Sequence, residues 1–201
     1  MKIKMFLFDF GGVISPEGFQ IGLLKIAQEI GRDFEVVREI AVNKAGLATG
    51  YFAGKAAEND FWDALSEGLG LDYSLKPLRY HFIDNFITRS QVTRLIKGLS
   101  HFYTVALFSD QTNWIYEVDT VYPFLHIFDH KFISCNSGYT KLDDKFYRLP
   151  EEKTGIPPKE TMLIDDKDSV LAKADKLGFN THKFTSVADF KEFIVKERLL
   201  P

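Results

Sequence analysis

The chain has 201 residues, a formal charge of −3 at neutral pH, and 45% hydrophobic against 26% charged residues. This composition is typical of a folded globular protein, and it argues against intrinsic disorder. The near balance of charge argues against a protein that wraps nucleic acid or binds membranes through a polybasic surface. The single cysteine, Cys135, excludes an intramolecular disulfide and any metal site built on several cysteines.

The sequence contains no stretch that predicts a membrane span, because a span needs about 20 consecutive apolar residues. Lys2 and Lys4 imitate the start of a secretory signal peptide, but Asp9 interrupts the short apolar run that follows them. We therefore expect a cytoplasmic protein with no nucleic-acid partner and no membrane partner. The sequence gives no indication of the oligomeric state.

Five short apolar runs predict the strands of a sheet. They cover residues 2–10, 104–108, 131–134, 161–164 and 181–184. Helical patterns separate or follow them at 91–99, 114–121, 143–154, 170–177 and 187–198. Strands that alternate with helices are typical of an α/β protein with a parallel sheet, in which functional groups gather beyond the carboxyl ends of the strands.

Residues 16–88 break this alternation. Apolar side chains recur there at helical spacing, and Gly and Pro residues separate the successive helices. We expect an all-helical cap domain, or lid, at 16–88, inserted into a core domain made of 1–15 and 89–201. Within the lid, Tyr51, Phe61 and Trp62 are expected to pack between helices rather than to line a substrate pocket.

Distinctive polar residues follow four of the predicted strands. They are Asp9, Ser109, Lys141 and the pair Asp165-Asp166. Each alone is more often a turn former, a helix cap or a solvated side chain. Together at one edge of a sheet they fit phosphoryl transfer, because a carboxylate can attack phosphorus while hydroxyl, ammonium and backbone N–H groups stabilise the phosphoryl oxygens.

The carboxylates of this group also predict a metal ion. Asp9 and Asp166, with Asp165 nearby and a main-chain carbonyl near Gly11, offer the oxygen ligands that Mg²⁺ prefers. Without a cation, clustered carboxylates would repel one another and take up protons. A bound Mg²⁺ is therefore the expected cofactor.

Four segments, in this order, resemble the motifs of the haloacid dehalogenase (HAD) superfamily, and specifically its phosphatases with a helical cap. They are FLFDFGGV at 6–13, VALFSD at 105–110, GYTKLD at 138–143 and MLIDD at 162–166. The resemblance implies a Rossmann-like core and Mg²⁺ dependence. It also implies a phosphoric monoester phosphatase that acts on a small phosphorylated metabolite through a phosphorylated Asp9.

The same resemblance implies roles for individual residues. The catalytic residues would be Asp9, Ser109 and Lys141. The substrate would be bound by Gly12, Ser109, Asp110 and Lys141. The Mg²⁺ ligands would be Asp9, the Gly11 carbonyl, Asp166 and Asp165, the last either directly or through water.

Three positions depart from the family pattern. Gly11 stands where many family phosphatases carry an Asp that acts as general acid and base. Leu142 replaces a usual Pro, and Val170 replaces a frequent Asn. Glu17, just past the first motif, is a candidate for the missing acid, although a Glu at this point more often belongs to the first turn of a helix.

Three other functions share part of this pattern. A hydrolytic haloacid dehalogenase uses an Asp nucleophile without a metal, and the pair Asp165-Asp166 argues against it. A catalytically weak phospho-ligand-binding or regulatory protein is favoured by Gly11, Leu142 and Val170. A receiver domain has its acidic pair at the start of the chain and no inserted lid. Mg²⁺-dependent turnover of a phosphate ester separates the enzyme from the binding protein.

Overall fold

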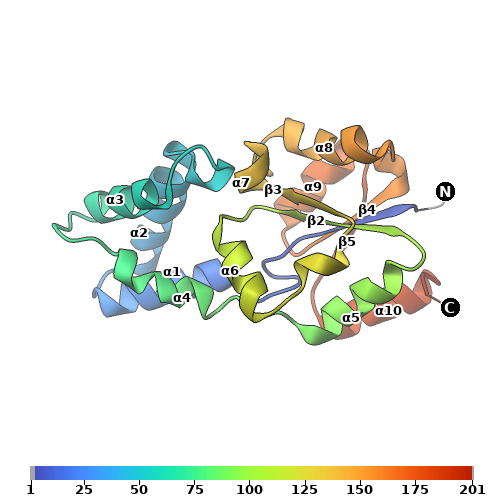
Figure 1. The fold of residues 1–201 in the computed structure, drawn as a ribbon, viewed down its shortest axis with the longest axis horizontal. Coiled ribbons are helices and arrows are strands. Elements are labelled where there is room, and N and C mark those ends of the chain that lie inside the picture. The colour runs from blue at the N-terminus through green and yellow to red at the C-terminus, as the bar shows by residue number, and fades with distance from the viewer. Residues whose placement is uncertain (1–2, 201) are drawn as a thin grey trace.

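The structure is a computed structural model that describes residues 3–200. Its centre is a five-stranded parallel sheet with the order β3-β2-β1-β4-β5 (Figure 1). The strands are β1 (Met5–Phe8), β2 (Thr104–Ser109), β3 (His130–Ile133), β4 (Thr161–Asp165) and β5 (Asn180–Lys183). The predicted α/β fold with a parallel sheet is confirmed; the first predicted run began at Lys2, which lies outside the described residues.

The register of the sheet brings distant parts of the chain to one edge. The central strand β1 pairs with both neighbours, and Phe8 lies opposite Leu107 of β2 and Ile164 of β4. The residues that follow these partners therefore emerge almost level at the carboxyl edge of the sheet. A further hydrogen bond, from the Asp9 N–H to the Ile164 carbonyl at 3.0 Å, extends this pairing past the end of β1.

Helices cover both faces of the sheet (Figure 1). Met5 and Leu7 of β1 share a buried cluster with side chains of α8 (Asp144–Thr154) and α9 (Asp168–Lys176). Phe6 and Phe8 point to the opposite face and pack with α5 (Ser90–Leu99) and α10 (Val187–Lys196). This alternation follows from the two-residue period of a strand. A strand buried on both faces reads as a continuous apolar run, as β1 does.

Two further helices lie between β2 and α8. They are α6 (Trp114–Val121) and the short α7 (Ser134–Ser137). The sequence pattern did not indicate α7, because four residues are too few to show a helical period. The sequence pattern suggested that Lys141 comes shortly after a strand. In the structure α7 lies between the end of β3 and Lys141. Lys141 reaches the carboxyl edge through α7 and a turn at Gly138, whose φ is +79°.

The remaining helices gather beyond the carboxyl edge of the sheet, on the left of Figure 1. They are α1 (Gly18–Glu29), α2 (Phe34–Glu39), which continues into a π-helical stretch (Ile40–Ala48), α3 (Glu58–Gly68) and α4 (Tyr80–Ile83). Short 3-10 turns occur at Tyr51–Ala53 and Lys76–Arg79. No helix within residues 3–200 is both long and apolar enough to cross a membrane.

Aromatic side chains join these helices to the rest of the fold through Trp114 of α6. The Trp114 ring stacks on Phe82 with centroids 4.8 Å apart, and it lies 5.9 Å from both Phe61 and Trp62. The Tyr51 hydroxyl donates a hydrogen bond of 2.7 Å to Asn113 Oδ1. Tyr51, Phe61 and Trp62 are buried in this packing, as expected from their helical spacing.

A substitution in α10 tests the packing of the sheet face that α5 and α10 cover. Phe190 is fully buried, and its ring centroid lies 6.0 Å from those of Phe8 and Phe184. Phe190→Ala leaves a cavity and should lower the free energy of unfolding by about 3–5 kcal/mol in urea denaturation. Val195→Ala, at a position on the same helix that is 75% exposed, should change it by less than about 0.5 kcal/mol. Equal effects of the two substitutions would contradict this packing.

Candidate active site

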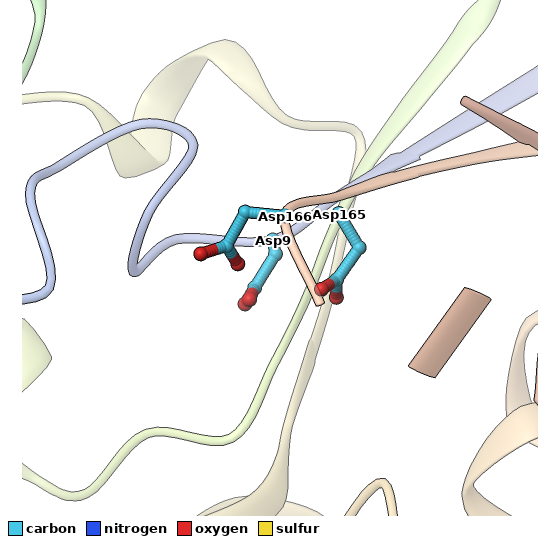
Figure 2. A group of neighbouring side chains, drawn as sticks. All are labelled: Asp9, Asp165 and Asp166. Carbon is cyan, nitrogen blue, oxygen red and sulfur yellow. The ribbon is translucent and has the colours of Figure 1, made fainter. Parts of the chain in front are cut away.

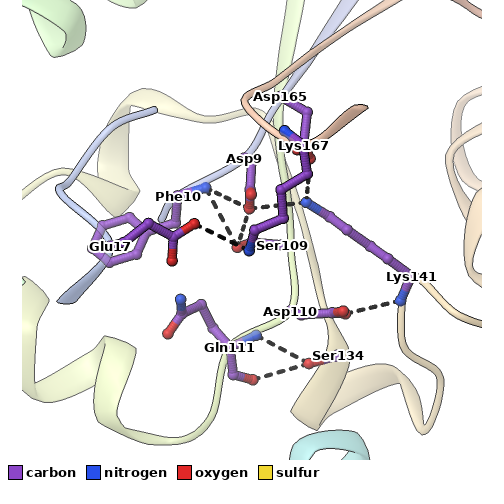
Figure 3. Close-up of polar contacts among 10 residues, drawn as sticks. All are labelled: Asp9, Phe10, Glu17, Ser109, Asp110, Gln111, Ser134, Lys141, Asp165 and Lys167. Carbon is purple, nitrogen blue, oxygen red and sulfur yellow. Dashed lines mark hydrogen bonds and ion pairs between the residues drawn. The ribbon is translucent and has the colours of Figure 1, made fainter. Parts of the chain in front are cut away.

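Asp9 follows β1 directly, and its carboxylate is buried and held by three donors (Figure 3). Its Oδ1 accepts hydrogen bonds from the Phe10 N–H at 2.7 Å and from Ser109 Oγ at 2.6 Å. The ammonium of Lys141 lies 2.9 Å from the same oxygen. Among the described residues every such contact is made to Oδ1, so the carboxylate has a fixed orientation in which Oδ2 is left for an incoming group.

Lys141 links two strand ends. Its Nζ donates to Asp165 Oδ2 at 2.7 Å, in addition to its contact with Asp9. Burial alone would lower the pKa of this ammonium, but the carboxylates of Asp9 and Asp165 outweigh burial and raise the pKa well above its usual range. The Lys141 N–H also donates to Asp110 Oδ1 at 2.9 Å, which anchors the loop. Lys141 is therefore a fixed positive charge beside Asp9.

Asp110 lies near Asp9 and Lys141, and its carboxyl group has a raised pKa. Loss of hydration raises the pKa of its carboxyl to about 6, and the nearby charge of Lys141 only partly opposes this rise. The carboxylate holds the backbone of the loop, and the side chain keeps an exposed surface where it lines the cavity described below.

Asp9, Asp165 and Asp166 form a carboxylate cluster at the carboxyl edge (Figure 2). Each offers an oxygen, and the three oxygens all lie within 4.8 Å of one another. Both oxygens of Asp165 already have protein partners, since Oδ2 accepts from Lys141 and Oδ1 accepts from the Lys167 N–H at 2.9 Å. Burial and the nearby Asp9 raise the pKa of Asp165. Asp9 and Asp166 are thus the freer members of the cluster.

Asp166 shows that this cluster suits a metal ion. Its Oδ1 is buried and has no hydrogen-bond partner among the described residues. Burial, followed by repulsion from the carboxylate of Glu17, raises its pKa to about 6. Gly12 adopts φ +80°, and a Cβ there would lie 2.2 Å from Asp166 Oδ2, so only glycine fits beside this carboxylate. An unpartnered buried oxygen in an all-oxygen set fits Mg²⁺.

A cavity of about 280 Å³ opens over Asp9, between the sheet edge and the helical segment 16–88, which lines it mainly through α1, the π-helical stretch and the 3-10 turn at Tyr51–Ala53. Its polar lining comprises Gly11, Glu17, Gln20, Asp110, Gln111, Thr112, Lys141 and Lys167 in addition to Asp9. The cavity is large enough for a small metabolite, and one of its walls carries the nucleophile candidate. Cys135 does not line it, and burial raises the pKa of that thiol to about 11. Its thiol is therefore protonated, as expected for an inert cysteine.

Known proteins share this fold along the whole chain. No protein-family model matches the sequence. A D-ribitol-5-phosphate phosphatase of Bacteroides thetaiotaomicron is 23% identical, over 94% of this chain and 96% of the relative. A predicted HAD-like family hydrolase from Porphyromonas gingivalis superimposes with a TM-score of 0.80 at 21% identity, over 98% of both chains.

Two more solved structures have the same fold as this chain. A HAD family enzyme from Bacteroides thetaiotaomicron, in complex with magnesium and inorganic phosphate, has a TM-score of 0.71 at 22% identity and covers 91% of this chain and 94% of its own. The L-2-haloacid dehalogenase of Xanthobacter autotrophicus has a TM-score of 0.66 at 15% identity, over 99% of this chain and 85% of its own. The chain adopts the HAD-like fold. The resemblance that its four motifs indicate is thereby confirmed.

In this fold Glu17 lies beside Gly11, the position at which the sequence departs from the family pattern. Glu17 is the N-cap residue of α1, but its side chain makes no capping hydrogen bond. It pairs instead with Lys167 at 3.1 Å (Figure 3), and its Oε2 lies 3.5 Å from the point that a Cβ on Gly11 would occupy. The carboxylate of Glu17 therefore lies in van der Waals contact with the position that a Cβ at residue 11 would occupy.

The sequence favoured a first-turn helix role for Glu17 and did not single out Lys167, which the structure places beside it at 3.1 Å. The carboxylates of Asp9 and Glu17 raise the pKa of Lys167, although burial alone would lower it. The available signal was position only, since Lys167 directly follows the acidic pair. The other two departures, Leu142 and Val170, line the cavity, and neither contacts the Asp9 carboxylate through a hydrogen bond.

Removal of one carboxylate tests the electrostatics of the cluster without any substrate. The pKa of Asp166 is about 6 in the fold, against about 3.9 when unfolded, so the metal-free folded state binds more protons between these values. The free energy of unfolding of the metal-free wild type should therefore fall as pH rises from about 4 to 6. Asp166→Asn should show a smaller fall, since Asp110 and Asp165 also have raised pKa values, and it should be the more stable protein at pH above about 7.

The response of the thermal unfolding midpoint to added Mg²⁺ tests whether the cluster binds a metal ion. Mg²⁺ should raise the thermal unfolding midpoint of the wild type at pH above about 7, because it binds the folded state, and the rise should largely disappear in Asp166→Asn. Asp168→Asn, at an exposed position two residues on, serves as the control and should respond to Mg²⁺ like the wild type. A wild type with no response to Mg²⁺ would contradict the metal site.

Proposed function

We propose that the protein is a Mg²⁺-dependent phosphatase that hydrolyses a small phosphorylated metabolite through an aspartyl-phosphate on Asp9. The observation that carries this proposal is the geometry of Asp9, whose Oδ1 is held by Ser109, Lys141 and a backbone N–H while Oδ2 is left without a partner among the described residues. The named activity of the Bacteroides thetaiotaomicron relative, which is a phosphatase, supports it.

Two displacements at phosphorus complete the reaction. In the first, Asp9 Oδ2 attacks phosphorus, the bond from phosphorus to the ester oxygen breaks, and the alcohol leaves with the electron pair and takes up a proton. In the second, water attacks the same phosphorus, the bond to Asp9 breaks, and inorganic phosphate is released. Lys141, Ser109 and the backbone N–H groups near Gly12 compensate the charge on the phosphoryl oxygens in both steps.

Asp9, Asp166 and the Gly11 carbonyl would hold Mg²⁺, with Asp165 bound directly or through water. The cation would neutralise charge between the carboxylates and the dianionic phosphate. Without that neutralisation, an anionic substrate would approach a cluster of carboxylates, two of which already have raised pKa values because of burial and mutual repulsion.

The helices of 16–88 act in this proposal as a lid over a core made of 1–15 and 89–201. Support comes from their position beyond the carboxyl edge of the sheet and from the side chains that they contribute to the cavity over Asp9 (Figure 1). Closure of such a lid excludes water from the reacting groups and adds contacts to the substrate.

Glu17 is the candidate that we propose as proton donor to the leaving alcohol and as base for the attacking water. Its carboxylate lines the same cavity as Asp9, and Gly11, which lies between them in the sequence, has no side chain to do this. Lys167, paired with Glu17 at 3.1 Å, keeps the carboxylate in this place.

Asp9→Asn tests the nucleophile. The variant keeps the side-chain shape but loses the attacking carboxylate, so Mg²⁺-dependent phosphate release from acetyl phosphate and 4-nitrophenyl phosphate should stop. Acid quenching followed by mass spectrometry should find a phosphorylated Asp9 in the wild type and none in the variant. Asp144→Asn, which alters a solvent-exposed carboxylate paired with Lys173, should retain normal activity.

The alternatives predict other results in the same experiment. A phospho-ligand-binding protein would bind inorganic phosphate and release none from any ester. A dehalogenase would work at full rate with a metal chelator and would release chloride from a haloacid. One of the solved structures with this fold is named as an L-2-haloacid dehalogenase. Near-normal phosphatase activity in Asp9→Asn would overturn the mechanism.

Glu17→Gln tests the proton donor, because the amide preserves the shape and a contact to Lys167 but cannot transfer the proton. Turnover of alkyl phosphates should fall by about 10²–10⁴-fold, whereas aryl and acyl phosphates, whose leaving groups need less help, should lose much less. The measurement is the ratio of the two kcat/KM values. Loss of both substrate types to the same extent would indicate a structural role for Glu17.

Gly11→Asp serves as the matched rescue for this substitution. A Cβ at Gly11 fits sterically, but it would bring a second carboxylate beside Glu17. Gly11→Asp alone should therefore give no increase in alkyl-phosphate turnover, because two adjacent carboxylates repel. In the Glu17→Gln background the same change should restore part of the lost turnover.

A further inference from the structure

The cavity has two chemically different ends. The phosphate end holds Asp9 and Lys141 at the sheet edge. The wall opposite is formed by the helices of 16–88, which contribute the side chains of Phe19, Val42, Leu47 and Phe52. This apolar wall, as we name these four side chains, faces the part of a substrate that lies beyond its phosphate group.

Polar groups are scarce on that side of the cavity. Among the described residues of the helices α1–α4 and their connections, Gln20 is the only uncharged polar side chain that lines it. A polyol or a sugar carries a hydroxyl on nearly every carbon, and each hydroxyl loses hydrogen bonds to water when it is buried against hydrocarbon. That side of the lining therefore disfavours a substrate body that has many hydroxyl groups, whereas the uncharged polar side chains Gln111 and Thr112 line the core side, near Asp9.

Positive charge is also lacking there. Within residues 3–200, the basic side chains that line the cavity are Lys141 and Lys167, both from the core and both paired with carboxylates. Lys55 lines a separate opening, where its ammonium lies 5.9 Å from the centroid of the Tyr139 ring. A second anionic group on the substrate would meet the carboxylate of Glu17 and no free cation.

The mouth of the cavity carries two exposed leucines. Leu47, from the π-helical stretch, is 36% exposed, and Leu142, from the core loop, is 69% exposed. Both line the cavity, and both also line the adjoining opening between the helices and the core. Exposed apolar side chains at the rim of a cavity are stabilised when an apolar ligand covers them. Leu142 thus offers apolar surface at this position that a polar residue would not.

We propose that the substrate is the phosphate monoester of an uncharged alcohol with an aliphatic or aromatic body, which packs on the apolar wall and under Leu47 and Leu142. This inference rests on the proposed phosphatase function and specifies its substrate class. It separates this chain from the Bacteroides thetaiotaomicron relative, whose name gives a polyol phosphate as its substrate.

Three primary phosphate esters of equal carbon number test the proposal: pentyl phosphate, D-ribitol 5-phosphate and the 5-phosphate of 5-hydroxypentanoate. The wild type with Mg²⁺ should have a kcat/KM for pentyl phosphate at least about 10-fold above that for ribitol 5-phosphate. The ester with the terminal carboxylate should be slower still, by about 100-fold or more, because its second charge finds no partner.

Leu47→Lys supplies the positive charge that the wall lacks. This position is partly exposed, so a lysine is tolerated there without loss of the core. The variant should lose kcat/KM for pentyl phosphate and gain at least about 10-fold for the carboxylate ester. Val36→Lys is the control, since Val36 is 47% exposed on α2 and does not line the cavity, and it should leave all three values unchanged.

The outcomes distinguish this proposal from the function on which it rests. If ribitol 5-phosphate or the carboxylate ester is turned over as well as pentyl phosphate or better, the substrate class is overturned and the phosphatase function stands. If none of the three esters and no acetyl phosphate is hydrolysed with Mg²⁺, the phosphatase function fails, and the substrate class fails with it. The expected ranking, reversed in part by Leu47→Lys, supports both.

Discussion

The site depends on the ion pairs that the ammonium of Lys141 makes with the carboxylates of Asp9 and Asp165. The ammonium lies within 2.9 Å of carboxylate oxygens from the ends of β1 and β4, and so it neutralises charge that would otherwise separate two neighbouring strand ends. Its own backbone N–H is fixed by Asp110. Because a buried ammonium is unfavourable without partners and buried carboxylates are equally so, each group keeps the other charged. In the reaction proposed above, the same charge would also compensate a phosphoryl group at Asp9.

The balance of charge around Asp9 also shapes the helical segment. Glu17 and Lys167 form a second pair across the site, between the start of α1 and the start of α9. That pair connects the helices beyond the sheet edge to the loop that carries the acidic residues. Carboxylates still outnumber ammonium groups in the cavity, so an anionic ligand enters favourably only together with a cation. Metal binding and substrate binding are therefore linked by electrostatics.

Much of this arrangement could be predicted from the sequence, for a physical reason. Parallel strands buried on both faces read as apolar runs, and their register brings Asp9, Ser109 and Asp165 to one edge whatever the loops do. The position of Glu17 could not be predicted, because it depends on the direction in which a side chain leaves the first turn of α1. The apolar wall could not be predicted either, since apolar residues at helical spacing do not reveal which of them face a cavity and which pack in the core.

The central position of β1 has a consequence for the synthesis of the chain. This strand leaves the ribosome before either of its partners, because β2 begins about a hundred residues after β1 and β4 more than fifty residues beyond that. Until they arrive, the four consecutive apolar residues Met5–Phe8 have no sheet to enter. The nascent chain therefore carries an unpaired apolar segment until β2 and β4 have been made, and native pairing of the central strand begins late.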